Sequence, residues 1–188
     1  MINQKYIPFI AGLIVLILFS SGAYYIVYGV RRSTDVVIAD HVQMLSSILT
    51  TINTTCGIID FEHSRNYIDF LNVRSFVGSE VGSMNLKNPQ HWQGPYVEDN
   101  PTIQEKMYII LKTKTGYYIV PDNGVELRSG AIIGKDLILD SQTNIEKLLI
   151  PGGPLNYRLK PLAARVSTLE DKPSNDSLLV AATSIEAE

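Results

Sequence analysis

Residues 35–52, DVVIADHVQMLSSILTTI, decide the fold predicted for this chain. Five apolar residues recur there at steps of four and three, which places them along one face of an α-helix. Polar residues fill most of the other face. We therefore expect this helix to cover a small sheet with its apolar side, which consists of Ile38, Val42, Leu45, Leu49 and Ile52.

The segment before this helix has no charged residue from Tyr6 to Val30. A helix of that length is roughly 37 Å long, which is enough to cross a bilayer. Tyrosines near its end are typical of a membrane interface, and Arg31 and Arg32 stop the run. We therefore predict that residues 1–32 form a single-pass membrane anchor with lipids as partners. A cleaved signal peptide ending near Ala23 is the alternative.

The chain beyond the amphipathic helix predicts α+β content. The apolar pattern from Ser64 to Val81 favours a second helix, and residues 85–100 favour a loop because they hold Pro89, Gly94 and Pro95. Short β-rich runs with tight turns then indicate an antiparallel meander. These runs are residues 107–111, 117–120, 125–128, 131–133 and 137–139, and a short helix is expected at 145–149.

The predicted fold class is thus α+β, with a long N-terminal transmembrane-plus-amphipathic helix packed on a small antiparallel sheet. The anchor would cover residues 1–32, and the globular domain residues 33–150. Residues 151–188 are more polar and are predicted to be a partly disordered tail.

Composition excludes several function classes. The formal net charge is −3 and no basic stripe occurs, so a nucleic-acid partner is not expected. Cys56 is the single cysteine, which rules out an intrachain disulfide and favours a buried, inert thiol. It has no basic neighbour in sequence, and His41, His63 and His91 stand in unrelated contexts. We therefore predict no enzyme, no catalytic residues and no cofactor.

One polar cluster holds candidate metal ligands by residue type. Asp60, Glu62 and His63 are close in sequence, but neighbours in one loop rarely converge on an ion. They are best interpreted as a solvated loop, and no metal-binding residue is assigned.

The stretch Pro89-Gln90-His91-Trp92-Gln93-Gly94-Pro95-Tyr96 is similar to the Trp-x-Gly-Pro-Tyr loop of type II secretion pseudopilins. This resemblance to type IV pilins and pseudopilins implies a pilin-like fold over about residues 6–140, with the C-terminal domain outside the cytoplasm (in the periplasm if bacterial). Two hallmarks of the family are missing, because Gly12 is followed by leucine and no glutamate precedes Glu62. Their absence removes the prepilin peptidase site and the carboxylate used in filament assembly.

The resemblance also directs attention to calcium, which major pseudopilins bind in a loop of the sheet region. The oxygen-bearing side chains in that part of this chain are Asp122, Asn123, Glu126, Asp136 and Asp140. EF-hand spacing is absent, and Asp122-Asn123-Gly124 is more often a hairpin turn.

The leading hypothesis is a non-enzymatic, membrane-anchored structural or assembly subunit of a secretion, pilus-like or other envelope complex. Its partners would be other membrane or envelope proteins, or further copies of itself. Small residues in the N-terminal helix would allow close helix contact; they are Gly12, Ser20, Ser21, Gly22 and Ala23. The alternatives are a membrane-tethered ligand-binding or sensor domain that uses the Trp92–Tyr96 loop, and a secreted enzyme after cleavage near Ala23.

Overall fold

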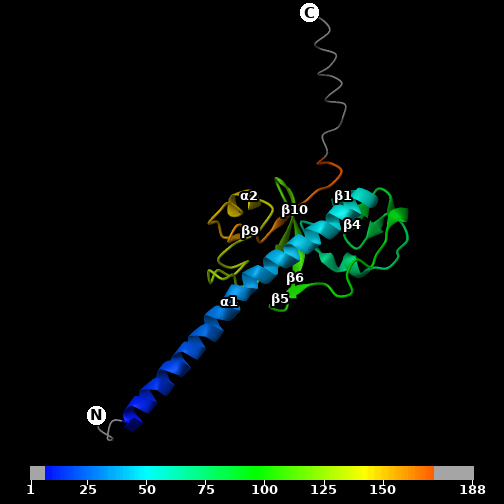
Figure 1. Cartoon of the computed structure of the whole chain (residues 1–188). Helices are drawn as coiled ribbons and strands as arrows, with labels where there is room; N and C mark the ends of the chain where they lie inside the picture. Colours follow the sequence, from blue (N-terminus) through cyan, green and yellow to red (C-terminus); the bar gives the residue numbers. More distant parts are fainter. Residues whose placement is uncertain (1–6, 172–188) are drawn as a thin grey trace, which may run out of the picture.

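One helix, α1 (Ile7–Thr55), runs past a body of short strands and loops in the computed structural model (Figure 1). The structure describes residues 7–171, with side chains described for 12–24 and 34–171. The N-terminal part of α1 projects away from the body, and its C-terminal part packs along it.

The apolar stripe on the C-terminal half of α1 is buried, as its periodicity predicts. Ile38, Leu45 and Ile52 have no exposed surface, and Val42 and Leu49 are 1% exposed. Burying one such side chain contributes about 1.5–3 kcal/mol, so this face is a main source of stability. The stripe packs against β7 and β10 of the sheet described next.

The main sheet is antiparallel and is built on one hairpin, β6 (Lys106–Thr113) and β7 (Gly116–Pro121). Two short strands extend it to the order β10-β7-β6-β2, where β2 is Arg65–Tyr67 and β10 is Ala164–Val166. A further short strand, β5 (Thr102–Ile103), also pairs with β6. The predicted strands 107–111 and 117–120 are therefore confirmed.

Smaller elements complete the fold. A second antiparallel sheet has the order β1-β4-β3, and a third pairs β8 with β9. The strands are β1 (Ile58–Phe61), β3 (Glu80–Val81), β4 (Met84–Leu86), β8 (Asn156–Tyr157) and β9 (Lys160–Pro161), and the short helices are η2 (Ile68–Asn72), η3 (Pro89–His91) and α2 (Ile145–Leu148).

The end of α1 is fixed by a buried hydrogen bond and a glycine. The Oδ1 atom of Asn53 accepts the backbone N–H of Ile58 at 2.9 Å. Gly57 has φ of +70°, a left-handed conformation that residues with a Cβ rarely adopt. Together they turn the chain from the helix into β1.

The predicted membrane-spanning helix is wrong. Among the described residues, no helix holds an apolar stretch long enough to cross a membrane. The transmembrane, pilin-like fold class and the single-pass localisation with an extracytoplasmic domain are corrected accordingly. What remains is an α+β fold with antiparallel sheets. Residues 1–6 of the predicted anchor lie outside the described residues.

The predicted second helix at Ser64–Val81 is also wrong. This segment forms β2, the short helix η2 and β3 instead. The side chain of Asn66 donates to the carbonyl of Ile110 at 3.3 Å, and the carbonyl of Leu71 accepts the N–H of Tyr96 at 2.8 Å. These long-range bonds tie the segment to the sheet and the loop, and they outweigh its helical apolar pattern.

Two further predictions need adjustment. The runs at 125–139 form isolated bridges, Glu126–Ile132 and Ile133–Leu137, in place of the predicted strands. Within the predicted tail 151–188, the structure places β8, β9 and β10 together with buried side chains, so the folded region reaches residue 171. Those buried side chains are Leu155, Tyr157, Leu162, Ala163 and Val166. Residues 172–188 lie outside the described residues.

Candidate functional site

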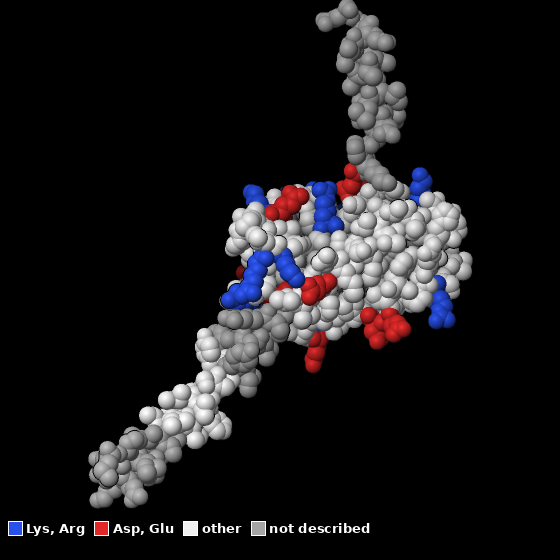
Figure 2. Space-filling view, in the orientation of Figure 1, with Lys and Arg blue, Asp and Glu red and all other residues white. Residues whose placement is uncertain are grey.

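The projecting part of α1 exposes a continuous apolar surface. Every large apolar side chain from Leu13 to Phe19 is exposed, from 49% at Leu13 to 78% at Phe19. Figure 2 shows this segment without a charged side chain on its described atoms. The hydroxyls of Ser20 and Ser21 donate back to helix carbonyls at 2.8 and 3.0 Å, so few polar groups remain free. Contiguous apolar surface of this kind marks an interaction site.

The outward face of the C-terminal half of α1 is also less polar than its sequence indicates. The hydroxyls of Thr50, Thr51 and Thr54 each donate to the carbonyl four residues earlier, at 2.8–3.1 Å. Because these hydroxyls bond the helix itself, the face offers a partner mainly small side chains and methyl groups.

A groove runs beside this face, between α1 and the segment that holds β9 and β10. Its volume is about 680 Å³. The side chain of Lys160 lies in its lining and is bonded to Asp40 by an ion pair with 3.2 Å between Nζ and Oδ1. Its other lining residues are uncharged, and they are Ala39, Val42, Gln43, Ser46, Ser47, Thr50, Thr51, Pro161 and Ala164.

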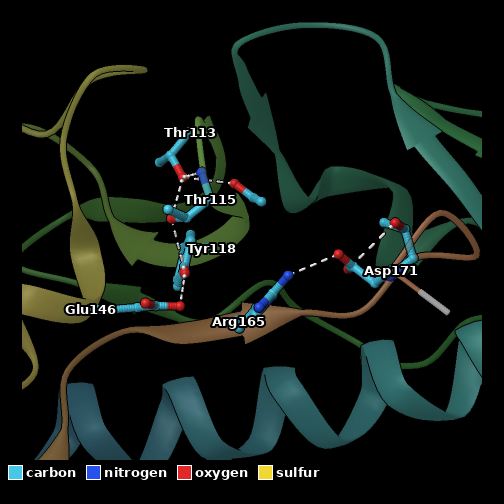
Figure 3. A network of polar contacts seen from close by, with 8 residues as sticks. Thr113, Thr115, Tyr118, Glu146, Arg165 and Asp171 are labelled. Carbon is cyan, nitrogen blue, oxygen red and sulfur yellow. Dashed lines mark hydrogen bonds and ion pairs between the residues drawn. The ribbon is translucent and has the colours of Figure 1, made fainter. Parts of the chain in front are cut away.

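Polar contacts near β10 hold the sheet edge that forms one wall of this groove (Figure 3). The hydroxyl of Tyr118 donates to Oε1 of Glu146 at 3.0 Å and contacts the Thr115 hydroxyl at 3.2 Å. Burial raises the pKa of Tyr118, which keeps this hydroxyl a donor. Arg165 binds Asp171 at 2.8 Å. These contacts join β7 to α2 and β10 to the residues after it, which is a structural role.

A buried tyrosine and a histidine join α1 to β6 in a similar way. The Tyr108 side chain has no exposed surface, and its hydroxyl lies 3.1 Å from Nδ1 of His41. Burial lowers the pKa of His41 and raises the pKa of Tyr108. Both shifts favour the uncharged forms of the two groups at this contact between α1 and β6.

The structure does not bring the cysteine and the histidines together in one site. Cys56 is fully buried. His63 lies 3.7 Å from Glu62 at the surface, and Nδ1 of His91 lies 3.2 Å from the carbonyl of Thr55. Each histidine thus has its own local partner, and no nucleophile–base pair results.

The metal candidates are engaged in protein contacts. Within the described part of the chain, no group of three or more His, Cys, Asp or Glu side chains could hold a metal ion. Asp60 accepts from Asn85 at 2.6 Å, and Asp122 forms an ion pair with Arg65 at 2.6 Å. The remaining candidates also have partners: Asn123 accepts from Arg65, Asp136 from the N–H of Ile132, Asp140 from Gln142 and Thr143, and the backbone of Glu126 bonds Gln104.

The Trp92–Tyr96 loop packs against its own surroundings. The Nε1–H of Trp92 donates to the carbonyl of Val73 at 3.0 Å. Its ring meets Phe76 and Tyr96 edge to face, with centroids 5.5 and 4.9 Å apart. Gly94 has no room for a side chain beside this ring. Shallow hollows of about 340 and 140 Å³ lie next to the loop.

Sequence reasoning missed the groove. Its second wall comes from Lys160, Pro161 and Ala164, which lie in the segment predicted to be a tail. The run Pro161-Leu162-Ala163-Ala164 is apolar without a period of two, so it gives no clear strand signal. Its pairing partner β7 is more than 40 residues away in the chain.

Comparisons with known proteins identify no relative: no family model, no curated protein and no solved structure matches this chain. Nothing in them indicates a pilin or pseudopilin, so that resemblance stays a prediction from the Trp92–Tyr96 loop alone.

Proposed function

We propose that this protein is a non-enzymatic structural or assembly subunit, which enters a larger complex through the apolar segment of α1 at residues 12–24. The observation that carries the proposal is the exposure of this segment. Leu16 and Leu18 are each 64% exposed, and Phe19 is 78% exposed. Burying such a side chain contributes about 1.5–3 kcal/mol, so a complex in which a partner covers this segment would be strongly stabilised.

The shape of the molecule supports the same role. The segment lies on the projecting end of a helix whose other half is fixed in the domain core (Figure 1). A partner can therefore contact the helix without disturbing the fold. A secretion or pilus-like assembly is the narrower proposal, and it depends on the resemblance of the Trp92–Tyr96 loop.

The alternative of a ligand-binding or sensor domain has less support. It requires aromatic side chains that are free to receive a ligand. Trp92 instead bonds Val73 and packs between Phe76 and Tyr96, which is how a ring that fixes a loop behaves.

The proposal is tested by affinity purification of the tagged full chain from its native cells after chemical cross-linking, followed by mass spectrometry. The triple variant Leu16→Ser/Leu18→Ser/Phe19→Ser should lose the cross-linked partners. A matched control, Val77→Ser/Ile150→Ser, changes side chains on the body that are 99% and 58% exposed, and it should keep them. A lone wild-type chain with no cross-linked partner, or equal recovery with the triple variant, would contradict the proposal.

A further inference from the structure

We infer that the groove between α1 and the β9–β10 segment receives residues 12–24 from a second copy of this chain. This inference rests on the proposed function and names the partner of the same apolar segment. It follows from where the segment and the groove lie, from their lengths and from their chemistry.

The segment cannot enter the groove of its own chain. Both lie on the continuous helix α1. They are centred near residues 18 and 45, which puts them about 40 Å apart along the helix axis. A helix cannot fold back on itself over that distance, so the occupant has to come from another molecule.

The uncharged part of α1 is long enough to cover the groove. The helical wall of the groove extends from Ala39 to Thr51, which is about 18 Å at 1.5 Å per residue. The sequence holds no charge from Tyr6 to Val30, so uncharged side chains can line the whole wall.

The chemistry agrees as well. The segment carries no charge, and the one charged side chain of the groove lining, Lys160, is already paired with Asp40. The threonine hydroxyls on the groove wall are bonded to their own helix, so docking would not strand them. Small side chains on the wall let a second helix approach closely, because the interaxial distance depends on the side chains at the contact.

The contact joins two different surfaces, the segment of one copy and the groove of the next. It can be made reciprocally by two antiparallel copies or repeated along a series of copies. Both arrangements bring residue 18 of one copy beside residues 45–47 of its neighbour. A test at these positions therefore does not depend on the orientation.

The test is disulfide cross-linking of full-length chains that carry tags of different size. Leu18→Cys is mixed with Ser47→Cys under a mild oxidant. Both positions are exposed, and native Cys56 is fully buried, so the parent chain serves as the control for its reactivity. The control pair is Leu18→Cys with Val77→Cys, whose position is 99% exposed on the body.

We expect the 18–47 pair to give at least ten times more mixed dimer than the 18–77 pair. Dominant 18–18 dimers, or equal yields for both pairs, would show that the groove does not bind residues 12–24. If the wild-type chain assembles through residues 12–24 without an 18–47 cross-link, this inference fails and the proposed function stands. If the chain is monomeric but binds a different protein through residues 12–24, this inference again fails and the proposed function stands. If neither assembly nor a partner is found, both fail.

Discussion

Leu18 and Leu45 offer a sharp comparison, because they are the same residue on the same helix in opposite environments. Leu18 is 64% exposed and Leu45 has no exposed surface. We predict that Leu45→Ala destabilises the fold of the domain and that Leu18→Ala does not. In an assembly assay we expect the opposite order, with Leu18→Ala weakening assembly more than Leu45→Ala.

The magnitude for Leu45 follows from what the substitution removes. Losing three carbon atoms from a buried side chain costs about 2.4 kcal/mol in transfer free energy at 0.8 kcal/mol each. The cavity left beside β7 and β10 adds to this, so the total should be about 3–4 kcal/mol. For a domain of this size, the expected drop in Tm is about 10–15 °C. Leu18→Ala should change the free energy of unfolding by less than about 0.5 kcal/mol.

The assay is urea unfolding followed by circular dichroism at low protein concentration, since assembly would add stability by mass action. Met44→Ala, at a side chain that is 40% exposed on the same helix, is the control for helix propensity. A loss below about 1 kcal/mol for Leu45→Ala would refute the packing of α1 as described. An equal loss for Leu18→Ala would show that residues 12–24 are covered within the monomer.

Three further predictions concern single polar groups. Burial raises the pKa of Asp35 above its ordinary value of 3.8. The folded state therefore binds this proton more tightly, and the resulting stability is lost as pH rises through the raised pKa. Asp35→Asn keeps an acceptor for the N–H of Arg128 and cannot titrate. The stability of this variant relative to wild type, measured by urea titration, should therefore increase from about pH 4 to about pH 7. A stability difference that does not change with pH would contradict the prediction. Asn53→Ala should lower the free energy of unfolding by about 1–3 kcal/mol, because it leaves the buried N–H of Ile58 unpaired. The control Thr54→Ala, at the next and exposed position, should lower it much less in the same unfolding assay. Tyr118→Phe removes the hydroxyl that bonds Glu146 and should lower stability by about 1 kcal/mol, and no change in thermal unfolding would show that this contact is dispensable.

The parts of the fold that the sequence predicts are those with a local repeating pattern. The stripe from Ile38 to Ile52 has helical spacing, and the whole stripe is buried. The strands around the turn at Gly116 are β-rich and adjacent in sequence, so their pairing is also local. Both depend on neighbours within a few residues.

The parts that the sequence does not predict depend on distant partners. Residues 64–81 have apolar spacing compatible with a helix, but Asn66 and Leu71 bond residues 44 and 25 positions away. β10 is three residues long and exists because β7 offers a free sheet edge. The predicted anchor rested on apolar composition alone, and among the described residues no helix is long and apolar enough to cross a membrane. The candidate groove needed β10 in place and so could not be inferred.

The central claim in its strongest form is that copies of this chain assemble through residues 12–24 of α1. Sedimentation velocity over a range of concentrations tests it most directly, with wild type beside the triple variant Leu16→Ser/Leu18→Ser/Phe19→Ser. We predict wild-type species heavier than the 20.9 kDa chain, in proportions that rise with concentration, and a variant that stays at the monomer mass. A wild-type chain that remains a 20.9 kDa monomer throughout, or a variant that assembles equally well, would contradict it.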